Sequence, residues 1–118
     1  MDKLTITTPV SGEYLTTVRL TTGGICAVAG FDVDSTEDFK VCVTESLLIL
    51  KRSGYEAAEI TFTVGEALGC TVKGVGKLSA AEDSVEDEIS YALLDALLGK
   101  VEFIKNDGGR VASIAFEG

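Results

Sequence analysis

Histidine and tryptophan are absent from this 118-residue sequence, proline occurs once, and there are only three cysteines, Cys26, Cys42 and Cys70. Without histidine, the chain cannot build a Ser-His-Asp or Cys-His nucleophile system, and most zinc sites are excluded as well. The cysteines are odd in number and form no C-x-x-C pair, which is typical of thiols that fill a core. The commonest routes to nucleophilic and zinc catalysis are therefore excluded.

Long apolar runs and basic residues are also scarce. The longest strongly apolar run, 47–50, is far shorter than a membrane span, and no apolar signal region follows residues 1–3, so we expect a cytoplasmic protein. Ten Lys and Arg stand against 19 Asp and Glu, which gives a formal net charge of −9. This balance argues against binding to nucleic acid or to an anionic membrane surface, and it permits a basic protein partner.

What the sequence does contain is enough apolar material for a core, at 46% hydrophobic residues, so we expect residues 1–118 to form one domain. Hydrophobic periodicity and turn residues predict strands at 4–7, 60–64, 68–72, 101–105 and 110–116, and helices at 11–29, 35–54 and 84–99. The order β-α-α-β-β-α-β-β predicts an α+β fold, with one mixed, mainly antiparallel sheet and three helices on one face.

Local signals refine these elements. Ser35 to Asp38 resembles a capping box at the start of the second helix, and 77–83 is polar and loop-like. The predicted core stripe of the second helix is Phe39, Cys42, Val43, Ser46, Leu47 and Leu50. The predicted apolar face of the third helix is Val85, Ile89, Ala92, Leu93, Ala96 and Leu97. The tetrapeptide Asn-Asp-Gly-Gly at 106–109 predicts a closing hairpin.

This order and several local strings resemble the anti-sigma-factor serine kinases of the sporulation and general stress systems, within the histidine-kinase/gyrase/heat-shock-protein ATPase superfamily. The resemblance covers essentially the whole chain. It is strongest at 14–50, where Val43-Thr44-Glu45-Ser46 matches the pattern V-x-E-[SA]. The closing string LLDALLGKVEFIKNDGGRVASIAF also resembles the family. The resemblance implies a two-layer sandwich of the histidine-kinase-like ATPase (Bergerat) type, and a homodimer formed through the first strand and helix.

The second helix of the family carries a glutamate that polarises a water or the attacking hydroxyl, and four residues later an asparagine that binds magnesium. Glu45 matches the glutamate, so the resemblance makes it a vestigial general base. The alternative is a glutamate that is simply solvated or caps local polar groups. Ile49 stands at the asparagine position. Because a hard cation needs oxygen ligands, we expect no metal site here.

The family's other two nucleotide motifs are also altered. Its adenine-binding Asp-x-Gly falls on Gly74-Val75-Gly76, where Gly76 matches but Gly74 replaces the aspartate that accepts a hydrogen bond from adenine. These glycines are therefore interpreted as a remnant of the adenine motif. The glycine-rich phosphate turn falls near Asp87, Glu88 and Ser90, where carboxylates repel phosphates. We expect neither ATP binding nor another cofactor.

Arg19 lies where an arginine of the family contacts the sigma factor and the antagonist, so it is the predicted partner-binding residue; a local ion pair with Glu13 or a neighbour is the alternative. The leading hypothesis is an anti-sigma-factor-like regulatory protein that binds a sigma factor or an anti-anti-sigma protein without hydrolysing ATP. One alternative is a serine/threonine kinase that uses ATP and magnesium through an altered site, with Glu45 as base. Another is a scaffold with a different ligand in the old cleft.

Overall fold

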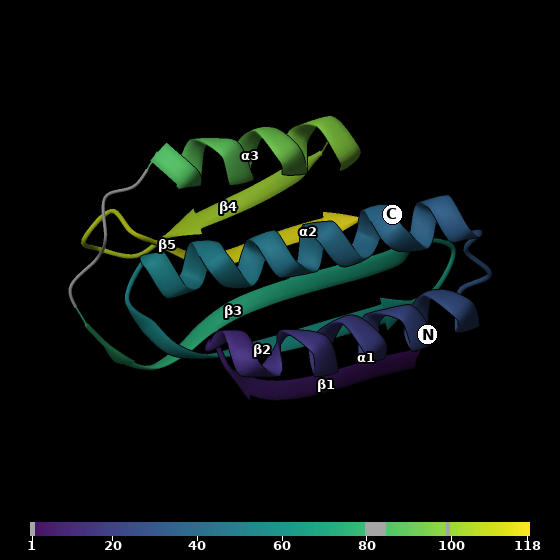
Figure 1. The fold of residues 1–118 in the computed structure, drawn as a ribbon, viewed down its shortest axis with the longest axis horizontal. Helices are drawn as coiled ribbons and strands as arrows, with labels where there is room; N and C mark the ends of the chain where they lie inside the picture. The colour runs from purple at the N-terminus through teal and green to yellow at the C-terminus, as the bar shows by residue number, and fades with distance from the viewer. Residues whose placement is uncertain (1, 80–84, 99) are drawn as a thin grey trace.

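The computed structural model describes residues 2–79, 85–98 and 100–118 as three helices packed on a sheet (Figure 1). The strands are β1 (Asp2–Pro9), β2 (Tyr55–Val64), β3 (Leu68–Leu78), β4 (Val101–Lys105) and β5 (Val111–Glu117). The helices are α1 (Leu15–Val28), preceded by a 3-10 turn (Gly12–Tyr14), α2 (Val33–Arg52) and α3 (Val85–Leu98). The predicted α+β class and element order are confirmed.

The sheet has the order β1-β2-β3-β5-β4, and each of these pairings is antiparallel. The middle and closing hairpins join at β3 and β5, which leaves β1 and β4 at the two edges. All three helices cover the same face, with α2 across the middle strands, α1 on the β1 side and α3 on the β4 side (Figure 1). Among the described residues, no helix has the length and hydropathy needed to cross a bilayer.

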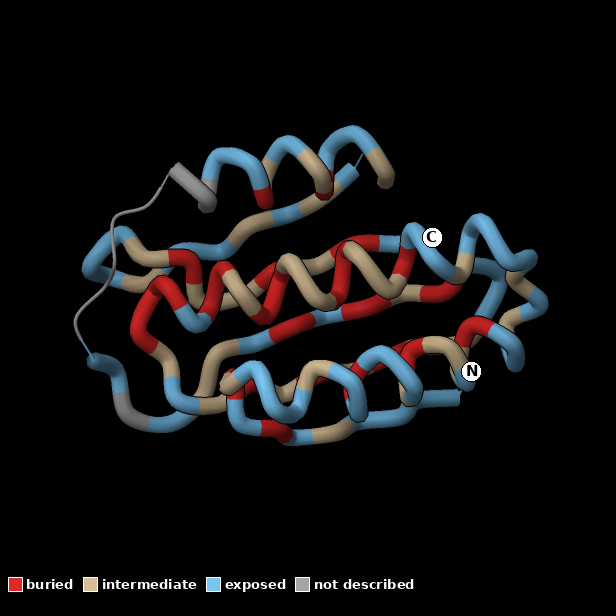
Figure 2. Tube along the Cα trace, viewed as in Figure 1, coloured by how far each residue is buried: buried red, intermediate tan, exposed pale blue. Residues whose placement is uncertain are grey.

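The core lies between α2 and the sheet, as the buried segments in Figure 2 show. Alternate residues of the inner strands, including Ile60, Phe62, Val72 and Ile114, point toward the helices and are fully buried. All six residues of the predicted α2 stripe are buried as well. The helical period therefore identified the correct face of α2.

Several predicted boundaries are wrong: β1 spans Asp2–Pro9 instead of 4–7, and β2 begins at Tyr55 instead of residue 60. Helix α2 begins at Val33, because the Asp32 side chain accepts a hydrogen bond from the Ser35 backbone N–H at 2.8 Å and so caps the helix three residues before the predicted start. Strand β3 continues to Leu78, which pairs with Tyr55, so the start of the predicted 77–83 loop is strand. The rest of that loop from residue 80, and the predicted helix ends at 84 and 99, lie outside the described residues.

The predicted apolar face of α3 is largely wrong, although Leu97 does pack against the core; the side chain of Val85 lies outside the described residues. Ile89 is 58% exposed, whereas Ser90 and Leu94 are buried. The helix is therefore turned by about one residue from the orientation that its leucines and isoleucine favour. In this orientation Leu94 enters the core and Ser90 makes a polar contact with α2, which local periodicity does not reveal.

Candidate functional site

The residues predicted to carry catalysis lie on the side of α2 that faces α3. Because residues three and four positions apart share a helical face, Glu45, Ile49 and Arg52 lie on one side of α2. Ile49 has no exposed surface and belongs to the core. Its hydrocarbon side chain thus fills the position at which the resemblance places the magnesium ligand.

A serine hydroxyl joins the two charged residues of this face. The Oγ of Ser90 donates a hydrogen bond to Oε2 of Glu45 at 2.5 Å and accepts one from Nη2 of Arg52 at 2.7 Å. Ser90 is 2% exposed and Arg52 is 8% exposed. Hydrogen bonds to charged partners are shorter and stronger than neutral ones, so this bridge ties α2 firmly to α3. The partly buried Glu45 carboxylate is thereby engaged by the protein itself.

The structure brings Glu45 together with Ser90. The resemblance assigned Glu45 to the catalytic helix and Ser90 to the phosphate turn. Glu88 is exposed on α3, and the side chain of Asp87 lies outside the described residues. Sequence reasoning did not include Arg52 in the site. A basic residue seven positions after Glu45, on the same helical face, was the available signal.

Gly74 lies in β3 opposite Ala58, beneath an aromatic ring. A Cβ at Gly74 would lie between 2.5 and 2.7 Å from three ring carbons of Tyr55, closer than real Cβ contacts. No side chain larger than hydrogen fits there unless the ring moves. The space that an aspartate would need at this position is therefore taken by Tyr55.

Gly76 has a backbone reason to be glycine. The register of β2 and β3 passes from Ala57–Val75 to Tyr55–Leu78, so two residues of β3 oppose one of β2 in a bulge. Gly76 lies in this bulge with φ +86°, a left-handed conformation that side chains rarely adopt. A Cβ there would also overlap the Glu56 side chain. The backbone conformation therefore explains the glycine at position 76 without any role in nucleotide binding.

Tyr55 is the residue of this region that sequence reasoning missed. Its hydroxyl accepts a hydrogen bond from Nδ2 of Asn106 at 3.1 Å, and Oδ1 of Asn106 accepts from the backbone N–H groups of Gly108 and Arg110. The loop between β4 and β5 therefore holds the ring from its polar end. The available signal was the isolated glycines within a strand pattern, because such glycines indicate a bulge or a site where another group closely approaches the backbone.

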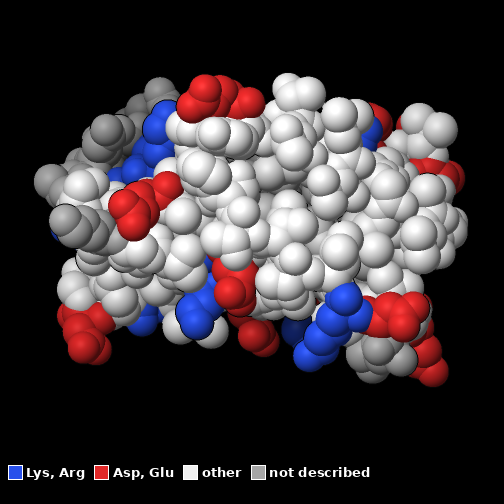
Figure 3. Space-filling view, turned by 90° about the horizontal axis from the view of Figure 1, so that it is seen from below, with Lys and Arg blue, Asp and Glu red and all other residues white. Residues whose placement is uncertain are grey.

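Arg19 lies on the exposed side of α1, far along the chain from these contacts. Within the part of the chain that the structure describes, no hydrogen bond or ion pair of its side chain is found, and Glu13 instead accepts from Ser11. The neighbouring Leu20 is 70% exposed. Figure 3, seen from the side of α1 and β1, shows a broad area with few charges at its centre. Within α1, Arg19 is the one charged residue of the helix.

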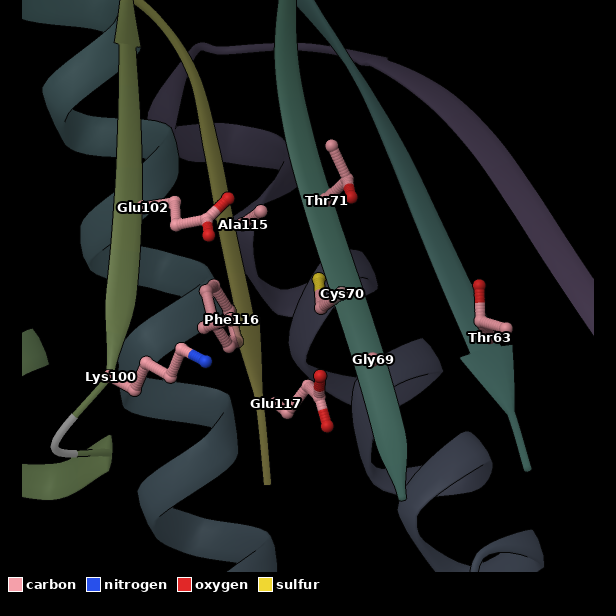
Figure 4. A pocket seen from close by; sticks show the side chains of 9 residues that line it. All are labelled: Thr63, Gly69, Cys70, Thr71, Lys100, Glu102, Ala115, Phe116 and Glu117. Atoms are coloured by element: carbon pink, nitrogen blue, oxygen red, sulfur yellow. The ribbon is translucent and has the colours of Figure 1, made fainter. Parts of the chain in front are cut away.

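Two hollows lie away from the predicted nucleotide positions. One, of about 360 Å³, lies on the sheet face that the helices leave open, where Gly69 and Ala115 are flanked by Lys100, Glu102 and Glu117 (Figure 4). The other, of about 340 Å³, is lined by residues from the start of α2, the end of α3 and the end of β5. Neither is lined by Glu45, Ile49, Gly74 or Arg19.

The three cysteines are buried free thiols. Burial raises the pKa of Cys26 to about 11 and that of Cys42 to about 12, and it raises the pKa of Cys70 as well. Thiols with such values are protonated at neutral pH and are poor nucleophiles. Among the described residues, no group of three acidic or cysteine side chains is placed to hold a metal ion.

Comparison with known proteins finds similarity over part of the chain. No protein-family model matches it. The serine-protein kinase RsbW of Listeria monocytogenes serovar 1/2a is 33% identical over 58 residues, which are 49% of this chain and 37% of the relative. That of L. monocytogenes serotype 4a is 39% identical over 46 residues, 39% of this chain and 29% of the relative. That of Bacillus mycoides is 30% identical over 66 residues, 54% of this chain and 41% of the relative. These matches confirm the resemblance over about half of this chain, not over its whole length, and they span less than half of each relative.

Proposed function

We propose that this chain is a regulatory protein of the anti-sigma-factor type, which binds a sigma factor or an anti-anti-sigma protein and does not hydrolyse ATP. The similarity to serine-protein kinases RsbW supports the protein family and the kind of partner. The observation that carries the absence of ATP chemistry is the α2–α3 contact, in which Ser90 engages Glu45 beside the buried Ile49.

The physical argument concerns what phosphoryl transfer requires. Catalysis of this kind depends on positioning and on a magnesium ion that neutralises charge on the phosphates. Ile49 offers the cation no oxygen, and Glu45 must leave Ser90 before it can act on a hydroxyl. Breaking a hydrogen bond to a charged group costs about 1.5–3 kcal/mol. Both effects oppose the reaction.

Partner binding is assigned to α1. An arginine whose guanidinium makes no hydrogen bond or ion pair within its own chain is available for bidentate pairing with a carboxylate of another protein. Arg19 meets this condition among the described residues, the adjacent Leu20 is exposed, and the exposed Tyr14 ends the 3-10 turn just before α1. Arginine and aromatic residues also dominate the binding energy of many interfaces.

A homodimer through β1 and α1 forms part of the proposal. Strand β1 is an edge strand, and an unpaired edge is a template for a strand of a second copy. Light scattering of the purified protein is expected to give about twice the chain mass of 12.4 kDa. A monomeric mass at every concentration would contradict this part.

The absence of ATP binding is tested by thermal unfolding with and without ATP and magnesium. A ligand present at one hundred times its Kd stabilises the folded state by about 2.7 kcal/mol, which raises the Tm by roughly 10 °C in a domain of this size. We expect no shift with Mg-ATP. A shift that requires magnesium would overturn this part of the proposal.

Partner binding is tested with the sigma factors and anti-anti-sigma proteins of the same genome, by calorimetric titration. We expect one of them to bind, and Arg19→Ala to weaken binding at least tenfold. Lys73→Ala, which removes an exposed cation from the open sheet face, is the matched control and should bind like the native protein. If Arg19→Ala binds as tightly as Lys73→Ala, Arg19 is not part of the interface. If none of these proteins binds, the proposed class of partner is refuted.

The second candidate is an ATP-dependent serine/threonine kinase with Glu45 as base and Mg-ATP as cofactor. The printed name of the relatives, serine-protein kinase, favours it. Glu45→Gln separates the candidates, because glutamine still accepts the Ser90 hydrogen bond but cannot take a proton. The kinase predicts magnesium-dependent phosphorylation of an anti-anti-sigma protein that this variant loses. The regulatory protein predicts no phosphorylation by either form and unchanged partner binding.

A further inference from the structure

The position of Tyr55 follows from an irregularity in the sheet. The bulge in β3 opposite Glu56 shifts the register at the start of β2. Bulges commonly re-aim a side chain, and here the Tyr55 ring lies on the helix-covered side, packed against the core and over Gly74. The ring therefore occupies space between the sheet and the helix layer.

The ring is also held at its rim by a network at this end of the sheet. Asn106 donates to the Tyr55 hydroxyl, and the Arg110 backbone N–H in turn donates to Asn106. The Arg110 guanidinium donates to the backbone carbonyls of Ser53, at the end of α2, and Ser79, after β3. The chain segments around the ring are thus fastened to one another, which fixes the shape of the space that the ring fills.

We propose that Tyr55 fills an aromatic-ring site formed at Gly74 by the chain itself, so that the protein supplies its own ring where the family's adenine motif would meet a base. Removal of the ring leaves a flat site for a small aromatic molecule of phenol size. The inference rests on the proposed function, because both require that the native protein leaves no room for ATP.

The first test removes the ring and offers a substitute. Tyr55→Ala is expected to lower the Tm by roughly 10 °C, and p-cresol, which reproduces the lost side chain, is expected to raise it again, because a cavity of matching shape binds its missing group. The native protein and Tyr55→Phe, whose ring remains, should not respond. A folded Tyr55→Ala protein that p-cresol does not stabilise overturns the inference.

The second test measures the coupling between Tyr55 and Gly74 without any ligand. Gly74→Ala should lower the Tm of the native protein, because its methyl group meets the ring, and should be neutral or stabilising once the ring is gone. Gly69→Ala is the matched control in β3, where a Cβ makes only ordinary contacts at 3.8 Å, and should behave alike in both backgrounds. Tyr55→Val, a good strand former without a ring, replaces Tyr55→Ala if the latter does not fold.

Additive effects of the two substitutions would show that the ring does not lie on Gly74 and would overturn the inference. This outcome is distinguishable from failure of the proposed function. Binding of Mg-ATP by the native protein would refute the proposed function even if the coupling is found. Additivity, by contrast, leaves partner binding through Arg19 untouched.

Discussion

Restoring the family's magnesium ligand by Ile49→Asn is expected to destabilise the protein without creating nucleotide binding. Ile49 is fully buried, so the substitution loses about 2 kcal/mol of apolar burial. It also places an amide in the core at a cost of about 1–3 kcal/mol where hydrogen-bond partners are lacking. The sum, about 3–5 kcal/mol, is a large share of the 5–15 kcal/mol typical of a domain.

The assay is urea unfolding followed by circular dichroism, together with thermal unfolding in the presence and absence of Mg-ATP. The expected loss corresponds to a fall in Tm of roughly 10–20 °C. Ile49→Val is the matched control, because it keeps the apolar character and should cost only about 1 kcal/mol. Both variants are expected to be insensitive to Mg-ATP, since Gly74 and Ser90 still lack the groups that hold a nucleotide.

One result would refute this reasoning. If Ile49→Asn is as stable as the native protein and gains a magnesium-dependent rise in Tm, position 49 faces a usable nucleotide site instead of the core. The structural assignment of Ile49 as a packing residue would then be wrong. A destabilised variant with no response to Mg-ATP is what the packed α2–α3 contact predicts.

Three further predictions concern the core and the helix ends. Ser90→Ala removes the hydroxyl between two charged partners, so urea unfolding should show a loss of about 1–3 kcal/mol; a native-like value would mean that the bridge contributes nothing. Because burial raises the pKa of Cys26 to about 11 and of Cys42 to about 12, and raises that of Cys70, Ellman's reagent should modify these thiols at neutral pH only after unfolding, and rapid reaction of the folded protein would contradict this. Asp32 accepts a backbone hydrogen bond that lowers its pKa, so the cap stabilises the fold above the ordinary pKa of 3.8 and loses this effect as the pH falls through the lower folded value. The difference in unfolding free energy between the native protein and Asp32→Ala should therefore disappear in acid. A difference that does not change with pH would refute the cap.

The element order was predictable because its signals are local. The closing turn at 106–109, the alternation around Phe62 and the α2 stripe each depend on neighbours within a few residues. Such patterns state which face of an element is apolar. The structure confirms them because α2 and the inner strands bury the apolar faces that these patterns define.

The contacts that decide the site are long-range, and local patterns do not contain them. Ser90 meets Glu45 and Arg52 from another helix, and this contact turns Ile89 outward against the apolar period of α3. Tyr55 lies over Gly74 next to the bulge in β3, where the register of the two strands shifts. The resemblance located the altered motif positions, but it gave no information on what occupies the space around them.

The altered positions are matched by neighbours that fit them. A site that had lost only its ligands would leave polar groups facing an empty space, at a cost in unsatisfied hydrogen bonds. Here Glu45 is bound by Ser90, Ile49 is enclosed by the core, and the missing side chain of Gly74 makes room for Tyr55. Each change is therefore coupled to packing, and reversing one residue alone works against the fold. Surfaces that the core does not use are free of this coupling, which is one reason for placing the proposed partner contact on the exposed side of α1 around Arg19.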